Sequence, residues 1–566
     1  MSRASVVLRE GDTHEYRKDR GAFFTPKSIA RYLAARTMGP STASVLEPSC
    51  GEAVFLLAAA ERAGDSANSI SLSGIDLHRP SVDFARSLLD DVGVDAELVV
   101  NDFFDVSGSG DYDAVLGNPP FVRFHRHSGH ARAKALGAAA NAGVKLNELA
   151  SSWAPFVAHA TSFLAPGGAL GFVLPAELLY ADYAAPIRAM LVERFRTIEL
   201  TLFDERVFPD VQEEVILLSA NGYGSGPSRT INILSLPGTK ALVGVTPSHR
   251  NAVDSNSFGH TVRTAVPPVG GERWTSFISG TGASEIIAAQ VTEGNFAPLL
   301  SWGTTRLGAV TGSNRFFAIT EAERKSWKIP ESEVVRISPP GSKHLRNLDF
   351  SAEAWRELTD AGLPTLLFRP DESPSVGARR KLREGVSAEV DRAYKCRVRS
   401  PWWRTPLSDA PDLLLTYMNA QVPQLVTNSA EVRHLNSIHG VYVDDSLRDL
   451  AKDLLPLAAL NSLTAVDAEF TGRGYGGGLL KLEPGEAARW AVPSPLLVFR
   501  IADDLRSIKP EVMELLADDD IDGAISRVDD VILSAAGLDS ASTLTVTEDR
   551  FALKARRAAR SKKRKQ

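Results

Sequence analysis

The tetrapeptide Asn118-Pro119-Pro120-Phe121 follows the apolar run 112–117 and has the residue types best suited to chemistry in this sequence. An exocyclic amine on an aromatic base is a poor nucleophile, because its lone pair is delocalised into the ring. The Asn118 side-chain oxygen and the Pro119 carbonyl, held by two fixed proline φ angles, could each accept one N–H and localise that pair. Phe121 could stack on the base. The tetrapeptide thus predicts a loop that prepares an amino group to attack a methyl carbon.

Three earlier apolar runs also end in residues that could hold a ligand. The first runs into Glu47, Pro48, Cys50 and Gly51, where a proline and a glycine shape a turn that backbone amides could use to approach a cofactor. Asp76 ends the second run and could accept hydrogen bonds from both hydroxyls of a ribose. Asp102 and Phe103 end the third, where a carboxylate could accept from an adenine amine beneath an aromatic ring.

Each of these strand ends is weak when taken alone, and simpler explanations exist. Glu47 could be a carboxylate that interacts with a helix N-terminus, and an isolated Asn-Pro-Pro is more often a strand terminator than a clamp. Their serial order favours one site, since ligands of a doubly wound sheet bind beyond the carboxyl ends of its strands. A carboxylate in the first turn suits a cationic, phosphate-free cofactor.

The elements that must position these residues follow from the alternation of short apolar runs and amphipathic stretches between residues 20 and 220. This alternation is typical of a doubly wound α/β fold with a mostly parallel sheet. Thr25 and Pro26 predict an N-cap and a first helical residue ahead of a helix over 27–36. Seven strands are expected, at roughly 44–46, 69–75, 96–100, 112–116, 169–174, 198–203 and 214–220.

The length of 566 residues exceeds what one hydrophobic core usually organises. The stretch 221–227 has the composition of a linker, so we expect a first domain over 1–222. A second, mixed α+β domain is expected over 223–500, although periodicity does not give its fold. Helical spacing returns after residue 500 and predicts a helical extension over 501–566 that ends in a disordered basic tail from Lys554.

Composition narrows the class of protein. The chain has two cysteines, which excludes a disulfide framework and disfavours a zinc site, and we expect no metal even at the pair His434 and His439. Cys50 lies outside the loop in which a cytosine-C5 nucleophile would stand. We find no apolar run that could span a membrane and no secretory signal, so a cytoplasmic location is expected. The net charge of -6 argues mildly against a nucleic-acid partner, but basic residues cluster within 379–404.

The order of Thr25-Pro26, Glu47–Gly51, Asp76, Asp102-Phe103 and Asn118–Phe121 resembles the gamma-class adenine-N6 DNA methyltransferases of bacterial restriction–modification systems. The resemblance covers residues 20–222. It implies that Thr25 contacts the S-adenosylmethionine cofactor and that the Asn-Pro-Pro-Phe loop is catalytic. It further implies that Phe208, in a Val-Phe-Pro loop, stacks on the flipped adenine opposite Phe121. Many members have a second glycine where this chain has Ala53, which leaves the path of the cofactor turn open.

By the same resemblance, the second half is similar to a target-recognition domain that grips double-stranded DNA, and a separate cognate restriction endonuclease is a further expected partner. Arginines beside aromatic residues suit phosphate and base contacts. Packing of the aromatics in a core, with arginines on the surface, is at least as good an explanation for any single residue. The candidates are Arg315, Arg397, Arg399, Trp402, Trp403, Arg404 and Arg473.

Three alternatives stay open at this point. Enzymes that methylate a glutamine amide of proteins (glutamine-N5 methyltransferases) use the same kind of loop, but they are compact and lack such a C-terminal half. A bifunctional restriction–methylation enzyme would usually carry its nuclease before Thr25, where only about 20 residues stand, and Glu323-Arg324-Lys325 has no aspartate at a useful distance before it. A non-catalytic DNA-binding subunit is the third alternative, which measurable turnover of cofactor would exclude.

Overall fold

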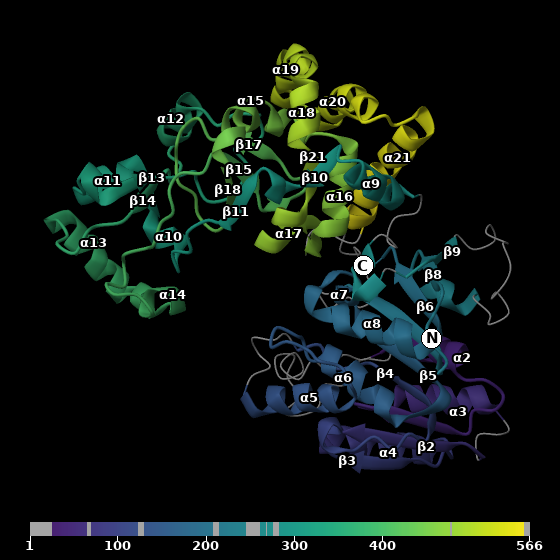
Figure 1. Ribbon diagram of the computed structural model, residues 1–566. Helices are drawn as coiled ribbons and strands as arrows, with labels where there is room; N and C mark the ends of the chain where they lie inside the picture. Colours follow the sequence, from purple (N-terminus) through teal and green to yellow (C-terminus); the bar gives the residue numbers. More distant parts are fainter. Residues whose placement is uncertain are drawn as a thin grey trace. The chain divides into compact units, whose positions relative to one another are not determined.

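The computed structural model describes residues 25–64, 69–122, 129–205, 207, 214–244, 261–267, 269–275, 282–475 and 478–559. The chain divides into two compact units, Met1–Ile278 and Ser279–Gln566. Figure 1 colours the first unit from purple to teal and the second from teal through green to yellow. Each unit has its own sheets and helices, which are described separately below.

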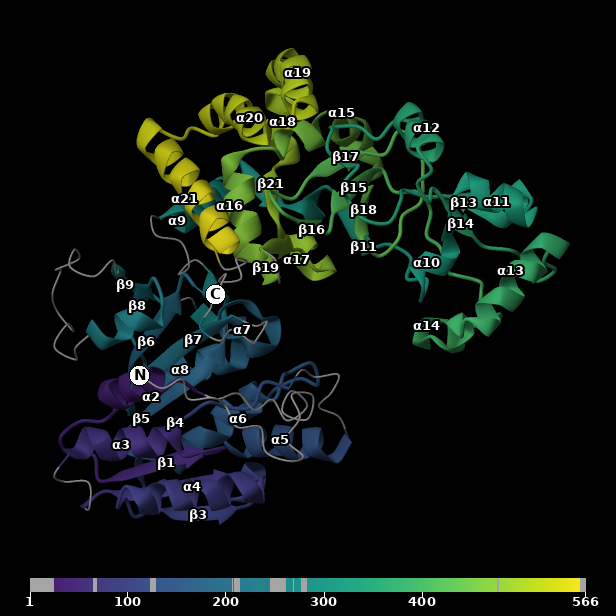
Figure 2. The same cartoon turned by 180° about the vertical axis from the view of Figure 1, so that it is seen from behind.

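The first unit is built on a nine-stranded sheet of order β3-β2-β1-β4-β5-β7-β6-β8-β9 (Figures 1 and 2). The first five strands are parallel to one another, whereas β7 is antiparallel to both β5 and β6. The doubly wound, mostly parallel fold is therefore confirmed. The strands are β1 (Ser44–Pro48), β2 (Ser71–Asp76), β3 (Glu97–Val100), β4 (Tyr112–Gly117), β5 (Leu164–Pro175), β6 (Phe195–Phe203), β7 (Val215–Tyr223), β8 (Ile231–Leu236) and β9 (Thr261–Ala265).

Helices cover both faces of this sheet. Successive strand residues point to opposite faces, and both faces carry apolar side chains that must be buried. Along β4, Val115 joins one buried cluster, whereas Ala114 and Leu116 join the other. The first cluster contains residues of α6 and α8, and the second contains residues of α2, α3 and α4. The helices of this unit are α2 (Lys27–Thr37), α3 (Val54–Ala63), α4 (Arg79–Asp91), α5 (Gly129–Asn141), α6 (Trp153–Ala160), α7 (Glu177–Tyr180) and α8 (Ala185–Arg194).

The first unit extends beyond the boundary expected near residue 222. The expected linker begins inside β7, and the next strand, β8, pairs in parallel with β6 from Ile198↔Ile231 onward. In β8, Ile231, Ile233 and Leu234 are buried. The physical reason is that β6 would otherwise be an open sheet edge with unpaired backbone groups, which β8 satisfies. The Gly- and Ser-rich stretch thus connects two strands of one sheet, and the sheet has nine strands where seven were expected.

The second unit, Ser279–Gln566, is a mixture of helices and small antiparallel sheets. The strands pair as β10-β21, β11-β18-β15-β17, β12-β14-β13 and β16-β20-β19. They are β10 (Phe296–Pro298), β11 (Gly303–Leu307), β12 (Ala318–Ile319), β13 (Val334–Arg336), β14 (Leu366–Phe368), β15 (Leu413–Thr416), β16 (Met418–Asn419), β17 (Leu425–Thr427), β18 (Ile438–Val443), β19 (Arg473–Tyr475), β20 (Leu479–Lys481) and β21 (Ala491–Pro493).

The helices of the second unit continue to residue 559, so the expected separate extension after residue 500 belongs to this unit. They are α9 (Ala283–Thr292), α10 (Asn314–Phe317), α11 (Glu321–Trp327), α12 (Ala352–Asp360), α13 (Val376–Ser387), α14 (Tyr394–Arg397), α15 (Arg448–Ala458), α16 (Ser462–Thr471), α17 (Pro484–Arg489), α18 (Pro495–Arg500), α19 (Ala502–Ala517), α20 (Ile521–Ala535) and α21 (Ser540–Ala559).

The basic segment expected to be a disordered tail from Lys554 is ordered up to Ala559 as part of α21, which packs against α16 and α9. Arg557 is buried, pairs with Glu469 at 3.0 Å and donates to the carbonyl of Gln421 at 2.8 Å. These internal hydrogen bonds explain the order, because they satisfy carbonyls that would otherwise be buried without a donor. Residues 560–566 lie outside the described residues. No helix in the described ranges is long and apolar enough to cross a membrane.

Candidate active site

The turns after β1, β2 and β4 lie at one edge of the sheet, because β1 pairs in parallel with both β2 and β4. The backbone N–H of Gly51 donates to Asp76 Oδ2 at 2.8 Å, and the N–H of Cys50 donates to the Ile75 carbonyl at 2.9 Å. Asp76 Oδ1 accepts from the backbone N–H of His78 at 2.8 Å. The predicted cofactor turn and the predicted ribose carboxylate are therefore in direct contact.

The turn after β1 has an unusual backbone. Ser49, Gly51 and Ala53 have φ values of 58°, 50° and 57°, in the left-handed region that favours glycine. Ala53 is the residue before α3 and has no side-chain contact that caps the helix. This conformation explains why a glycine would be favoured at position 53, since each non-glycine residue there costs about 1–2 kcal/mol. The turn keeps this path despite the alanine.

Glu47 and Cys50 are buried in the same turn. Glu47 Oε2 accepts from the backbone N–H groups of Phe55 at 3.2 Å and Leu56 at 2.9 Å, so it stabilises the start of α3. This is the simpler role foreseen for Glu47, and its contact with a cofactor stays a prediction. Burial raises the pKa of the Glu47 carboxyl well above its usual range. Burial likewise raises the pKa of the Cys50 thiol, which makes it unreactive at neutral pH.

Asp102 and Phe103, which follow β3, have different surroundings. Asp102 Oδ1 accepts from the backbone N–H of Phe104 at 3.1 Å, and Lys134 of α5 pairs with Oδ2 at 3.0 Å. Phe103 is 5% exposed, and its ring centroid lies 4.6 Å from that of Phe156. This packing assigns the Phe103 ring to the core of the unit. Its contact with a cofactor adenine stays a prediction.

Asn118 is the first residue of the predicted catalytic loop. Its Nδ2 donates to Thr25 Oγ1 at 3.1 Å, whereas its Oδ1 is buried and has no hydrogen-bond partner among the described residues. A buried acceptor without a donor costs about 1–3 kcal/mol. Such an acceptor needs a donor from an ordered water or from a bound ligand. The oxygen left vacant is the atom that the sequence predicted would accept an amine N–H.

Thr25 has a different role from the expected N-cap. Pro26 is the residue that precedes α2, and the start of that helix has no side-chain cap. The Thr25 hydroxyl contacts Asn118 instead, which holds the amide so that its oxygen is the free end. Thr25 thus lies at the predicted catalytic loop, a contact that helix-capping statistics could not reveal.

Phe121, the last residue of the predicted loop, lies between the two core clusters of the sheet. Phe121 is half-buried and packs against both clusters. Ser49 Oγ donates to the Asn118 carbonyl at 3.3 Å, which joins the catalytic loop to the cofactor turn. A Cβ atom at Gly117 would lie 3.2 Å from the Pro48 carbonyl, so glycine permits this close approach. Phe208, the predicted second stacking residue, lies outside the described residues.

The candidate DNA-contacting residues of the second unit fall into two groups. Arg399 donates to the Thr311 carbonyl at 2.9 Å, Arg404 pairs with Asp371 at 3.0 Å, and Arg473 pairs with buried Glu486 at 2.6 Å. These three arginines have structural partners, which the basic composition of the segment did not reveal.

Two other candidates, Arg315 and Arg397, are exposed and make no side-chain hydrogen bond or ion pair with the described residues. Trp402 and Trp403 are half-buried, and their ring centroids lie 5.9 Å apart within a core cluster. The tryptophans therefore contribute to packing, and the exposed arginines are the residues available to a partner.

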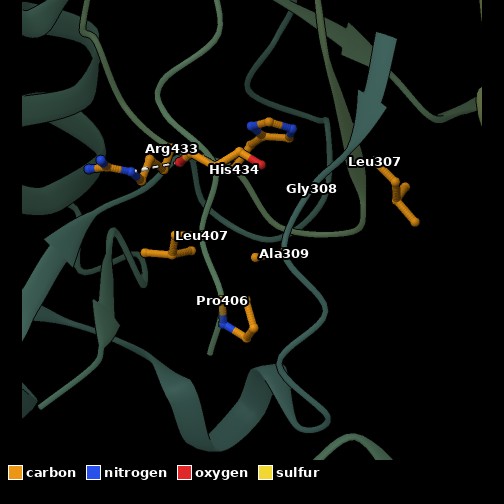
Figure 3. A pocket seen from close by; sticks show the side chains of 8 residues that line it. Leu307, Gly308, Ala309, Pro406, Leu407, Arg433 and His434 are labelled. Carbon is orange, nitrogen blue, oxygen red and sulfur yellow. Dashed lines mark hydrogen bonds between the residues drawn. The ribbon is translucent and has the colours of Figure 1, made fainter. Parts of the chain in front are cut away.

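A pocket of about 240 Å³ lies in the second unit between the segments 307–309 and 406–408 (Figure 3). Arg433 and His434 also line it, and Arg433 Nε donates to the Ser408 carbonyl at 2.8 Å. Burial lowers the pKa of His434 to about 4, so its ring is neutral at pH 7. None of the predicted site residues lines this pocket. Across the described ranges, no group of three His, Cys, Asp or Glu residues is arranged to hold a metal ion.

Comparison with known proteins gives matches over both units. Residues 8–219 match the family described as N-6 DNA Methylase, and residues 271–533 match the C-terminal domain of Type II methyltransferase M.Eco57I. Type II methyltransferase M.AccI of Acinetobacter calcoaceticus is 22% identical over 525 residues, which cover 92% of this chain and 94% of that protein. Type II methyltransferase M.XamI of Xanthomonas campestris pv. amaranthicola is 26% identical over 496 residues, 84% of this chain and 85% of that protein.

A solved structure described as a DrdV–DNA complex aligns with 88% of this chain and 58% of that chain, at a TM-score of 0.50 and 10% identity. This likeness concerns the fold alone. Residues 8–219 therefore belong to the N-6 DNA Methylase family, and residues 271–533 are similar to the C-terminal domain of a Type II methyltransferase.

Proposed function

We propose that residues 118–121 are the catalytic clamp with which this enzyme methylates N6 of an adenine that is flipped out of double-stranded DNA. One observation carries the assignment: Asn118 Oδ1 is buried without a donor, while its amide nitrogen is held by Thr25. An amino group of the target base would supply the missing donor. The Pro119 carbonyl would accept the second N–H of the same amine.

The clamp accounts for the chemistry of transfer. S-adenosylmethionine supplies a methyl carbon bound to a sulfonium sulfur. With the cofactor bound, the two acceptors would localise the N6 lone pair for attack on that carbon, with the sulfur as the leaving group. Asn118 Oδ1 and the Pro119 carbonyl stabilise the positive charge that appears on N6. N6 then loses one proton to water and becomes a neutral methylamine.

The cofactor would occupy the edge of the sheet formed by the turns after β1, β2 and β3. Asp76, which already contacts Gly51, has oxygens suited to the ribose hydroxyls. Asp102 would accept from the cofactor adenine amine, and Thr25, Pro48 and the backbone around Gly51 would enclose the methionine part. The closeness of Thr25 to Asn118 supports this placement, because the methyl carbon must lie beside the clamped amine.

DNA binding by the second unit is part of the same proposal. The exposed side chains of Arg315 and Arg397 are suited to phosphate contacts. The match of residues 271–533 to the C-terminal domain of a DNA methyltransferase supports DNA as the substrate and does not favour a protein glutamine. A separate cognate restriction endonuclease is the partner that a modification enzyme of this kind would accompany.

Asn118→Ala tests the catalytic assignment, with Asn141→Ala, at an exposed asparagine of α5, as the matched control. Loss of a positioned acceptor should lower kcat by about 100-fold or more while cofactor affinity stays near the wild-type value. Transfer of labelled methyl groups to adenine in duplex DNA measures kcat, and calorimetry measures cofactor binding. Wild-type turnover in Asn118→Ala would contradict the catalytic role of this residue. Methyl labelling of protein and not of DNA would contradict the proposed substrate.

A further inference from the structure

Ser152, just before α6, contacts the catalytic loop through three hydrogen bonds. The Val122 N–H donates to Ser152 Oγ at 2.8 Å, Ser152 Oγ donates to the Pro120 carbonyl, and the Ser152 N–H donates to the Val122 carbonyl at 3.0 Å. The side chain is 4% exposed. Two backbone groups of Val122 and one of Pro120 are therefore satisfied by a single residue that is distant in sequence.

The hydroxyl of Ser152 is used for the loop and not for its own helix. Serine before a helix commonly accepts from a backbone N–H of the first turn. At the start of α6 no such side-chain cap is present, although Ser152 occupies the N-cap position. A hydroxyl has one proton to donate, and that proton goes to the Pro120 carbonyl. The hydroxyl oxygen accepts from the Val122 N–H of the loop, and no N–H of the first turn of α6 donates to it.

The need for such an anchor follows from the prolines of the loop. Pro119 and Pro120 have no N–H groups, so they cannot be tied to the sheet by donating hydrogen bonds. The first available donor after them is the N–H of Phe121 or Val122. By holding the Pro120 carbonyl and the Val122 N–H together, Ser152 fixes the backbone on both sides of Phe121.

We propose that Ser152 is a positioning residue for methyl transfer: it sets the Phe121 ring and the Pro119 carbonyl relative to Asn118 without touching the substrate. The inference rests on the proposed function of the loop. In alignment-dependent reactions, a displacement of about 1 Å can lower the rate on the order of 100-fold. Removing the hydroxyl should therefore reduce kcat far more than it reduces the affinity for cofactor.

The test compares Ser152→Ala and the nearly isosteric Ser152→Cys with Ser162→Ala, whose hydroxyl donates to the His159 carbonyl at 2.7 Å just after α6. We expect kcat in the order wild type, Cys, Ala, with a loss of about 10-fold or more in Ser152→Ala. Cofactor affinity should stay within about twofold, as only the loop is loosened. DNA with 2-aminopurine at the target position should fluoresce more strongly in complex with Ser152→Ala, because the loosened Phe121 ring stacks on the base less well.

Each outcome decides the matter. Wild-type kcat in Ser152→Ala or in a folded Ser152→Cys overturns the proposal. A loss of kcat accompanied by a proportional loss of cofactor affinity or of melting temperature also overturns it, because the effect would then not be specific to the loop. An Ala variant that fails to fold leaves the Cys variant to decide. Failure of the proposed function is recognised separately, because Asn118→Ala would then keep wild-type turnover. If Ser152→Ala has wild-type kcat while Asn118→Ala is inactive, only the inference about Ser152 is contradicted.

Discussion

The contacts at the edge of the sheet in the first unit could be predicted from sequence better than those in the arginine-rich part of the second unit. At the sheet edge, residues that the sequence singled out far apart in the chain, such as Gly51 and Asp76 or Thr25 and Asn118, are in contact. In the second unit, Arg399 and Arg473 belonged to one set with Arg397, yet they have internal partners, whereas Arg397 makes no side-chain hydrogen bond or ion pair with the described residues. Sheet topology brings strand ends together, whereas composition does not tell a surface arginine from a structural one.

The largest effect that sharpens this comparison is expected at Thr25. Thr25→Val keeps the shape of the side chain but removes the acceptor for Asn118 Nδ2, so the amide can rotate away from its productive orientation. We expect kcat to fall about 10- to 100-fold, and Thr25→Ser, which keeps the hydroxyl, to retain most activity. Steady-state methylation assays check both variants. Equal kcat in Thr25→Val and Thr25→Ser would contradict the role of the hydroxyl.

The second unit can be tested with Arg399→Ala against Arg397→Ala. Arg399→Ala removes the guanidinium that donates to the carbonyls of Val310 and Thr311, so the free energy of unfolding should fall by about 1–3 kcal/mol. Arg397→Ala should leave stability unchanged, weaken DNA binding several-fold and reduce its salt dependence by about one phosphate contact. Denaturation and salt-dependent DNA binding separate the two. The division of the arginines would be wrong if the two variants exchanged these phenotypes.

A smaller effect is expected at Asp529, where burial raises the pKa of the carboxyl to about 6 although Ser462 donates two hydrogen bonds to it. The unfolded value is about 3.9, so the folded protein binds the proton more tightly. The contribution of the Asp529 proton to the free energy of unfolding is fully present below about pH 4 and is lost as the pH rises through about 6. Asp529→Asn should gain stability relative to wild type between pH 4 and pH 7. Urea unfolding across this range measures it, and a constant difference would contradict the assignment.

The smallest effect is expected at Ala53. Ala53→Gly relieves the left-handed strain at φ 57° and should stabilise the protein by no more than about 1 kcal/mol, since glycine also gains freedom in the unfolded chain. Ala63→Gly, at the end of α3, is the control and should destabilise. Melting temperatures compare the two. A destabilised Ala53→Gly would show that the turn is not strained by the alanine.

The sequence predicted the first seven strands well, because runs such as that before Asn118 have both apolar periodicity and a clear polar end. It did not predict β8 or β9, since the Gly- and Ser-rich stretch before β8 has the same composition as a domain linker. The burial of Arg557 was not predicted either, because the basic composition of the end of α21 is also typical of a disordered tail. Ser152 was missed because only the folded chain brings its hydroxyl to Pro120. Local patterns predict elements, and partners that form only in three dimensions escape them.

The vacant oxygen of Asn118 has a consequence for base selection. In the proposed clamp, this oxygen and a backbone carbonyl would accept two N–H groups from one nitrogen, and the amino groups of cytosine and guanine present the same pair. Such a clamp would therefore not distinguish adenine from cytosine or guanine. Preference for adenine must arise from the space that surrounds the extruded ring. Enzymes re-engineered toward another nucleobase should carry their changes around Phe121 and leave Asn118 untouched.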